Sequence, residues 1–160
     1  LCLHLEAHRV KLNAGSDLAF MVIDRDHHFT GNHQQSTRTA VNACKQRNID
    51  VICSTPSFDL WLLCHYVDIS QCSDDYKATA LANKKVSADN TFLKLEVSKV
   101  RNGESIKALL KHTAQALHNE SLLRQNTPDN IMPPTSLQAN IGKIIHIMSD
   151  HGLPIVTALK

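Results

Sequence analysis

LAFMVIDRDHH, residues 18 to 28, is the stretch of sequence that decides the fold. Six consecutive apolar residues, Leu18 to Ile23, lead directly into a polar end that contains Asp24 and Asp26. An unbroken apolar run of this length, bounded by polar residues, is typical of a strand buried on both faces of a parallel sheet. Ligand sites in open α/β sheets lie just outside the carboxyl ends of the strands, so the two acids indicate a site at this edge.

The D-x-D pair itself favours a divalent metal. Side chains alternate along a strand, so Asp24 and Asp26 are expected on one side and Arg25 on the other. Carboxylate oxygens suit Mg²⁺ or Mn²⁺, typically bound by one or two protein carboxylates together with water or phosphate. The alternative is an ordinary polar turn, because a D-x-D pair is short. The apolar run before the pair favours the metal site.

Length and composition indicate a single domain over residues 1–160. With 42% hydrophobic residues, 160 residues are enough for one core and too few for two comfortable ones. The 17 basic side chains nearly balance the 15 acids, so any phosphate-binding surface must be local. Leu1 to Leu5 alternates and reads as a short strand that ends near Glu6. Because the first residue already lies inside this element, we expect the natural protein to begin upstream.

The five cysteines favour a reduced, cytoplasmic protein. Their number is odd and no two have C-x-x-C spacing, which argues against a disulfide scaffold and against a zinc knuckle. Cys53 and Cys64 lie in apolar surroundings, where cysteine usually acts as a small core residue. The sequence has no run of 18 apolar residues and no signal-peptide pattern, so we expect a soluble protein without a membrane partner.

The residues after the acids predict a βαβ unit. Phe29 to Ser36 is polar, so we expect a mobile loop over the site. Thr37 to Asn48 has helical spacing, and Ile49 to Cys53 reads as the next strand. A right-handed crossover makes the two strands parallel, with both carboxyl ends on one edge. Ser54-Thr55-Pro56 should therefore emerge beside the acids.

A strongly apolar helix is predicted after this strand, over residues 57–66. Ser57 can cap its start, and Asp59 lies in its first turn, where the helix dipole favours an acid. That position alone explains Asp59; the functional alternative is a third carboxylate that points into the metal cluster. Trp61 and His65, taken in isolation, are more often core residues than ligands.

Most of the second half of the chain reads as helical. We expect a helix over residues 76–83 within a weakly packed polar excursion, and a longer one from Ser105 that fades by residue 126. The last helix is predicted over residues 137–149, with Thr135 or Ser136 as its cap. These elements divide the chain into a core βαβ region with the acidic site, residues 18–69, and a C-terminal helical part, residues 91–160.

Four lysines in or after the polar excursion are candidates for phosphate binding: Lys77, Lys84, Lys85 and Lys94. A solvated charged face is the more frequent explanation for such lysines. We keep Lys77 and Lys94 as candidate phosphate contacts.

Three segments resemble the RloB-like family of bacterial defence proteins. They are VIDRDHH (22–28), CSTPSFDLWLLCHY (53–66) and PPTSLQANIGKIIHIM (133–148). The family pattern is an apolar strand ending in D-R-D, a strand followed by S-N-P-x-F-E-L-W-L-L-x-H, and a late N-P-x-T that opens a helix. This chain departs from it at Thr55, where the family has Asn, at Asp59, where it has Glu, and at Pro133-Pro134-Thr135.

The resemblance implies a Toprim-like α/β fold with three layers, a mostly parallel central sheet and helices on both faces. Toprim domains join an early Glu to a D-x-D pair and bind Mg²⁺ or Mn²⁺ for phosphodiester hydrolysis. Asp24 and Asp26 match the D-x-D pair, and Asp59 would support a second ion or orient water. The early Glu is either Glu6 or lies upstream of the sequence. His65 would transfer a proton or hold its helix against the strand end.

The remaining residues of the two motifs are candidates for contact with the substrate. From the resemblance we expect four further residues to transfer protons or to bind phosphate: Arg25, His27, His28 and Ser54.

Two functions of different class follow from these residues. The first is a metal-dependent nuclease that cleaves RNA or DNA as an effector of anti-phage defence, beside an ATPase partner and with a homo-oligomer left open. The second is a non-catalytic Toprim-like partner or sensor subunit, which the uncertain early Glu and the balanced charge favour. A His-rich transition-metal site is a weak third reading, because His27 and His28 are adjacent and no second pair has ligand spacing.

Overall fold

The computed structural model describes residues 13, 17–124 and 132–152. Its centre is a pair of parallel strands, β1 (Phe20–Asp24) and β2 (Asp50–Ser54), in register from Phe20 opposite Asp50 to Asp24 opposite Ser54. Helix α3 (Gln34–Gln46) connects them. The predicted βαβ unit and the common edge of its two strand ends are therefore confirmed.

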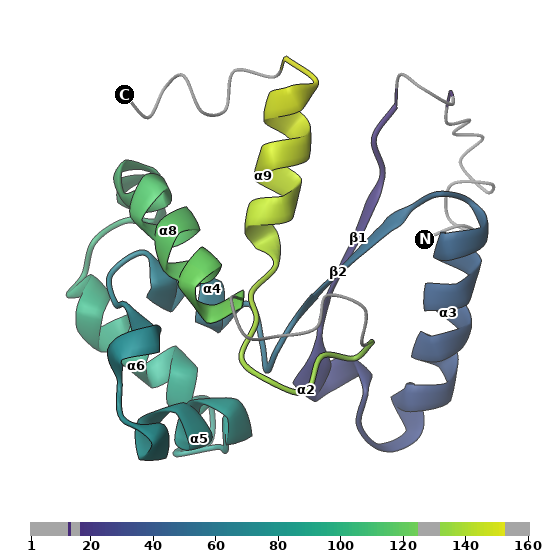
Figure 1. Cartoon of the computed structure of the whole chain (residues 1–160). Helices are drawn as coiled ribbons and strands as arrows, with labels where there is room; N and C mark the ends of the chain where they lie inside the picture. The colour runs from purple at the N-terminus through teal and green to yellow at the C-terminus, as the bar shows by residue number, and fades with distance from the viewer. Residues whose placement is uncertain (1–12, 14–16, 125–131, 153–160) are drawn as a thin grey trace.

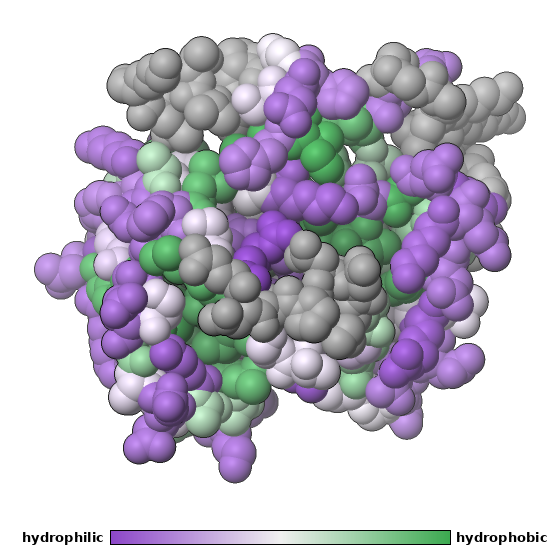
Figure 2. Space-filling model, viewed as in Figure 1, coloured by the Kyte–Doolittle hydropathy of each residue, from purple (hydrophilic) through white to green (hydrophobic). Residues whose placement is uncertain are grey.

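Each face of this small sheet packs on a core cluster, but β1 is less buried than the apolar run predicts: Ile23 is its one buried residue, and Val22 is 47% exposed. Met21 and Ile23 pack with Val41 of α3, whereas Phe20 and Ile52 join the larger cluster that includes helix α9 (Ile141–Asp150). Figure 1 accordingly shows the strands between α3 and α9. The outer face of α3 is hydrophilic (Figure 2). Because side chains alternate along a strand, the two faces of the sheet pack in different core clusters.

The helical region beside the sheet carries most of the core. Its principal buried residues include Leu60, Leu63, Ile69 and Leu93, each fully buried. The remaining helices and 3₁₀ turns of the described chain are α2 (Arg25–His28), η1 (Gly31–His33), α4 (Asp59–Cys64), η2 (Ile69–Gln71), α5 (Asp74–Ala82), α6 (Phe92–Arg101), α7 (Ile106–Leu109), η3 (Leu110–His112) and α8 (Thr113–Arg124).

Two predictions at the end of β1 are wrong. The strand ends at Asp24 and α2 begins at Arg25, so strand alternation does not govern Asp26. The predicted loop over Phe29 to Ser36 is largely ordered structure: Phe29 is buried, and α3 starts at Gln34. Phe29 packs in one core cluster with Ile23, Val41 and Cys53, which fixes this segment beside α3. The segment after Asp24 is therefore made of short helical turns, α2 and η1, and is not a mobile loop.

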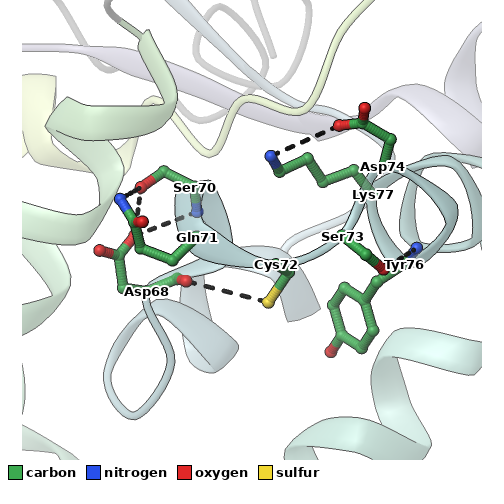
Figure 3. Close-up of polar contacts among 8 residues, drawn as sticks. All are labelled: Asp68, Ser70, Gln71, Cys72, Ser73, Asp74, Tyr76 and Lys77. Carbon is green, nitrogen blue, oxygen red and sulfur yellow. Dashed lines mark hydrogen bonds and ion pairs between the residues drawn. The ribbon is translucent and has the colours of Figure 1, made fainter.

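The excursion before α6 is better packed than predicted. Asp68 caps η2 by accepting from the Ser70 N–H, and Ser73 caps α5 by accepting from the Tyr76 N–H (Figure 3). The Tyr76 ring packs edge-to-face on Phe92 of α6, with ring centroids 5.4 Å apart. Capping and aromatic packing hold α5 against the helical core.

Several predicted helix boundaries also move. Ser57 does not cap α4: Phe58 is the N-cap residue and makes no side-chain cap bond. The helix predicted from Ser105 is interrupted by η3 before α8 begins. The last helix begins at Ile141, not Leu137, and neither Thr135 nor Ser136 caps it. Residues 137–140 lie instead at the end of β2, where Gln138 forms a backbone bridge with Thr55 and Asn140 donates to the Cys53 carbonyl.

The described residues support a mixed α/β fold with a two-stranded parallel sheet and several helices. The predicted strand at Leu1 to Leu5, Glu6 and Cys2 lie outside the described residues. Among the helices that the structure describes, none is sufficiently long and apolar to cross a membrane. The boundaries predicted at 18–69 and 91–160 stay predictions.

Candidate metal centre

The candidate centre is built where β1 and β2 end together. Asp24 lies opposite Ser54, and the chain after Ser54 turns through a cis Thr55–Pro56 bond. The Asp26 N–H donates to the Pro56 carbonyl, at 3.0 Å from N to O. The two acid-bearing motifs, 30 residues apart in sequence, therefore meet through backbone hydrogen bonds. This confirms that residues 54–56 emerge beside the acids.

Asp24 is held by the start of α4. Its Oδ1 accepts from the Phe58 N–H at 2.7 Å. Burial raises the pKa of the Asp24 carboxyl above its ordinary value, the Phe58 hydrogen bond opposes this, and the charges of Asp26 and Asp59 raise it further. A positive charge placed here would relieve the repulsion among the three acids.

Asp26 is held by Asn83, a residue that the sequence analysis did not select. The Asn83 amide donates to Asp26 Oδ2 at 2.9 Å and to Ser57 Oγ at 3.3 Å, and its Oδ1 accepts from the buried Leu93 N–H at 3.0 Å. Asn83 ends α5 in the left-handed region, φ 41°, and is buried. Asn is one of the few residues that tolerates this conformation, so its place at the end of the predicted helix was the available signal.

Asp59 comes from the first turn of α4, as predicted. Burial raises the pKa of its carboxyl, the Lys94 ammonium lowers it, and the Asp26 charge raises it. Asp59 and Asp24 also influence each other electrostatically. Three acids from three segments thus share one electrostatic environment at the strand edge, although the structure gives no ligand geometry for them.

The donor set of this centre suits a hydrated divalent cation. Within the described chain, no group of three or more His, Cys, Asp or Glu side chains is close enough to enclose a metal ion. The described contacts use Oδ1 of Asp24 and Oδ2 of Asp26 and leave the other oxygen of each for a cation or water. Mg²⁺ commonly takes one or two carboxylates and keeps several waters, so the residues present fit such an ion.

The late motif is attached to the same strand end. Thr55 and Gln138 pair through both backbone hydrogen bonds, at 2.7 and 3.1 Å, as an antiparallel bridge. Asn140, in the left-handed region at φ 60°, donates to the Cys53 carbonyl at 3.0 Å. This third motif therefore supports the turn that presents the acids, rather than contributing an acid of its own.

A comparison with protein-family models matches residues 4–148 of the chain to the model described as RloB-like protein. The match covers most of the chain and includes all three motifs around the strand edge. The chain belongs to the RloB-like family. No curated protein and no solved structure gives a significant match. Membership thus rests on the family model, and the geometry above shows how the family motifs meet in this member.

The histidines after the acids form a small cluster in this RloB-like chain. The ring centroid of His27 lies 4.8 Å from that of His28 and 5.4 Å from that of His33, a residue that the sequence analysis did not select. Burial and the neighbouring His27 lower the pKa of His28, while the Asp24 charge raises it. His28 is therefore the histidine that the structure links electrostatically to the acids.

His65 lies in the core and not among the acids. It is buried, its Nδ1 lies 2.9 Å from the Trp61 carbonyl, and its ring packs edge-to-face on Trp61 at 5.0 Å. Burial lowers its pKa. None of its described contacts reaches Asp24, Asp26 or Asp59, so the arrangement matches the core role weighed for it in the sequence.

The residues predicted to contact phosphate lie in different surroundings. Ser54 is fully buried and donates to the Ala139 carbonyl at 2.9 Å, so it faces the protein interior. Lys77 pairs with Asp74 at 3.7 Å (Figure 3) and borders a different pocket, with Leu81 and Leu137. Arg25 lies in α2 directly between the two site acids.

Lys94 is the predicted lysine that the structure brings to the centre. It lies in α6 and lines a pocket of about 350 Å³ that also contains Asp59. Its charge acts on the Asp59 carboxyl. Of the two lysines predicted to contact phosphate, the described structure therefore associates only Lys94 with the acids.

Proposed function

We propose that this RloB-like protein is a metal-dependent nuclease that hydrolyses phosphodiester bonds of RNA or DNA. The observation that carries the proposal is the meeting of Asp24, Asp26 and Asp59 around one strand edge, where burial and the charge of Asp26 raise the pKa of both Asp24 and Asp59. Clustered acids that resist ionisation are typical of sites completed by a cation. A Toprim-like, three-layer arrangement of the whole domain is part of the same proposal.

Asp24 and Asp26 would hold Mg²⁺ or Mn²⁺, with Asp59 supporting a second ion or orienting water. When bound, such a cation lowers the pKa of its water and offsets the charge of the phosphate in the transition state. The chain supplies the positioning: the Phe58 N–H fixes Asp24, and Asn83 fixes Asp26. His28, whose lowered pKa favours the neutral ring, is suited to accept a proton at a ring nitrogen.

The biological setting follows from the family resemblance. We propose a cytoplasmic effector of anti-phage defence that works with an ATPase partner, and Glu6 or an upstream residue as a further acid. A homo-oligomer is compatible with this arrangement.

Cleavage assays with matched substitutions test the nuclease. Purified protein should cleave labelled RNA or DNA with Mn²⁺ or Mg²⁺ but not with EDTA. Asp24→Asn should remove this activity while keeping an oxygen that accepts from Phe58, so the loss reports the charge and not the fold. Asp150→Asn, an exposed acid at the end of α9, serves as the control. Cleavage that persists in Asp24→Asn and in EDTA contradicts the proposal.

A non-catalytic partner or sensor subunit is the second candidate. It is favoured by the engagement of one oxygen of Asp24 and one of Asp26 by protein donors, and by the lack of a three-ligand group among the described residues. Hydrogen bonds of this kind also occur where acids only tie elements together. Calorimetric titration with Mg²⁺ and Mn²⁺ separates the two, because this role predicts no binding at millimolar or lower concentration.

A further inference from the structure

The pocket beside Asp59 has the composition of an anion site. It lies between α4 and α6, which pack against each other (Figure 1). Its volume is about 350 Å³, within the range of pockets that hold small ligands. Its walls combine apolar Leu62 and Val97 with polar and cationic groups, and Asp59, one of the three acids, is part of the lining.

One face of α6 supplies the cations. Lys94, Val97, Ser98 and Arg101 all line the pocket and follow the i, i+3, i+4, i+7 spacing of a single helix face. Seven residues at about 1.5 Å each separate the Lys94 and Arg101 backbones by roughly 10 Å along the helix axis. The two cations therefore lie at opposite ends of one helix face, with Val97 and Ser98 between them.

These two cations differ from other basic residues of the described chain in their partners. Lys77, Lys99 and Lys143 each pair with a carboxylate, at 3.7, 2.6 and 2.7 Å. The hydrogen bonds described for Lys94 and Arg101 go instead to backbone carbonyls, those of Asp89 and Glu104. A carbonyl orients a cation without neutralising it, so the pocket has two cations, Lys94 and Arg101, against the single carboxyl of Asp59, on which the Lys94 charge acts.

We propose that this pocket binds a phosphate of the nucleic-acid strand next to the phosphate at the acids, with Lys94 and Arg101 as its cationic contacts. The inference rests on the proposed nuclease function. The strand would pass from the acids, along Asp59, to α6, with a sugar or base against Leu62 and Val97. The substrate class is then a polynucleotide that extends at least one phosphate beyond the bond that is cleaved.

Binding measured without metal tests this subsite separately from cleavage. Fluorescence anisotropy of labelled single-stranded DNA and RNA in EDTA should show binding by the wild type. The double variant Lys94→Gln/Arg101→Gln should bind roughly tenfold more weakly at low salt, and the slope of log K against log salt should fall by about 1.4, or 0.7 for each lost contact. Lys99→Gln, on the same helix but paired with Glu96 outside the pocket, is the control and should bind like the wild type.

A charge-preserving variant guards against misfolding. Lys94→Arg/Arg101→Lys should retain most of the affinity, because the contacts are made by charge. Equal binding by the wild type and the glutamine variant, or no binding by the wild type, overturns the subsite. If the protein binds nucleic acid through these cations but shows no metal-dependent cleavage, the proposed nuclease function is wrong and the subsite stands. If it cleaves but the glutamine substitutions leave the affinity unchanged, the subsite is wrong and the nuclease function stands.

Discussion

Replacement of Asn83 by alanine should destabilise the protein far more than the same replacement at Asn102. Both asparagines end a helix, α5 and α6, in the left-handed region, at φ 41° and 44°. Only Asn83 is buried and bonded through its side chain to Asp26, Ser57 and the Leu93 N–H. The pair therefore separates the cost of the backbone conformation from that of the hydrogen-bond network.

The magnitude follows from two contributions. An alanine in the left-handed region costs roughly 1 kcal/mol, and this applies at both positions. At Asn83 the substitution also leaves the buried Leu93 N–H without its acceptor, which costs about 1–3 kcal/mol. Water can replace the bond to the partly exposed Asp26, so we count little for it. The expected loss in the free energy of unfolding is about 3 kcal/mol for Asn83→Ala and about 1 kcal/mol for Asn102→Ala.

Urea denaturation followed by tryptophan fluorescence measures both variants. Trp61 is the single tryptophan and is 5% exposed, so its emission reports loss of the helical core. Asn83→Gly adds a second comparison, because glycine relieves the backbone cost and keeps the loss of the side chain; about 2 kcal/mol should remain. Equal destabilisation by the alanine variants at positions 83 and 102 would refute the argument that the network, and not the turn, makes Asn83 important.

The other predictions concern titratable groups. Asp24→Asn, besides losing metal-dependent cleavage, should raise the urea midpoint at pH 7. A carboxyl whose pKa is raised in the folded state contributes stability that is present below its ordinary pKa of 3.8 and is lost as the pH rises. The neutral amide of asparagine has no such loss of stability at higher pH. The same sign holds for the buried Glu120, whose Oε2 accepts from a backbone N–H of α9. Burial raises its pKa above the ordinary value of 4.5. Glu120→Gln should therefore reduce the fall in stability between pH 4 and 8, as measured by urea denaturation across that range. Cys64 is buried and its thiol pKa is raised, whereas Cys72 is partly exposed; iodoacetamide at pH 8 should label Cys72 in the native protein and Cys64 only after unfolding, as mass spectrometry would show. An unchanged urea midpoint in Asp24→Asn together with a pH dependence in Glu120→Gln as steep as that of the wild type, or rapid native labelling of Cys64, would contradict this description of the burial.

The parallel βαβ unit, the family and the segments of the candidate centre could all be predicted from the amino-acid sequence. These follow from local information: a continuous apolar run before Asp24 and Asp26, a helical period before the next apolar run, and a proline after it. Such patterns are repeated along the chain and depend little on distant residues. The position of Asp59 in the first turn of α4 was equally local, because the acid lies close to the start of a strongly apolar helix.

Tertiary structure decided which residues serve those acids. Asn83 reaches Asp26 across 57 residues of sequence, and Gln138 pairs with Thr55 across a still longer separation. Neither contact leaves a periodic pattern, since each is one polar side chain or one bridge held by the packing of whole helices. The same reason explains why Ser54, predicted beside a phosphate, turns inward to Ala139, and why Lys94 lies at the acids whereas Lys77 does not. Sequence identified the acids, and only the packing of α5, α6 and the segment before α9 around the strand edge determined their partners.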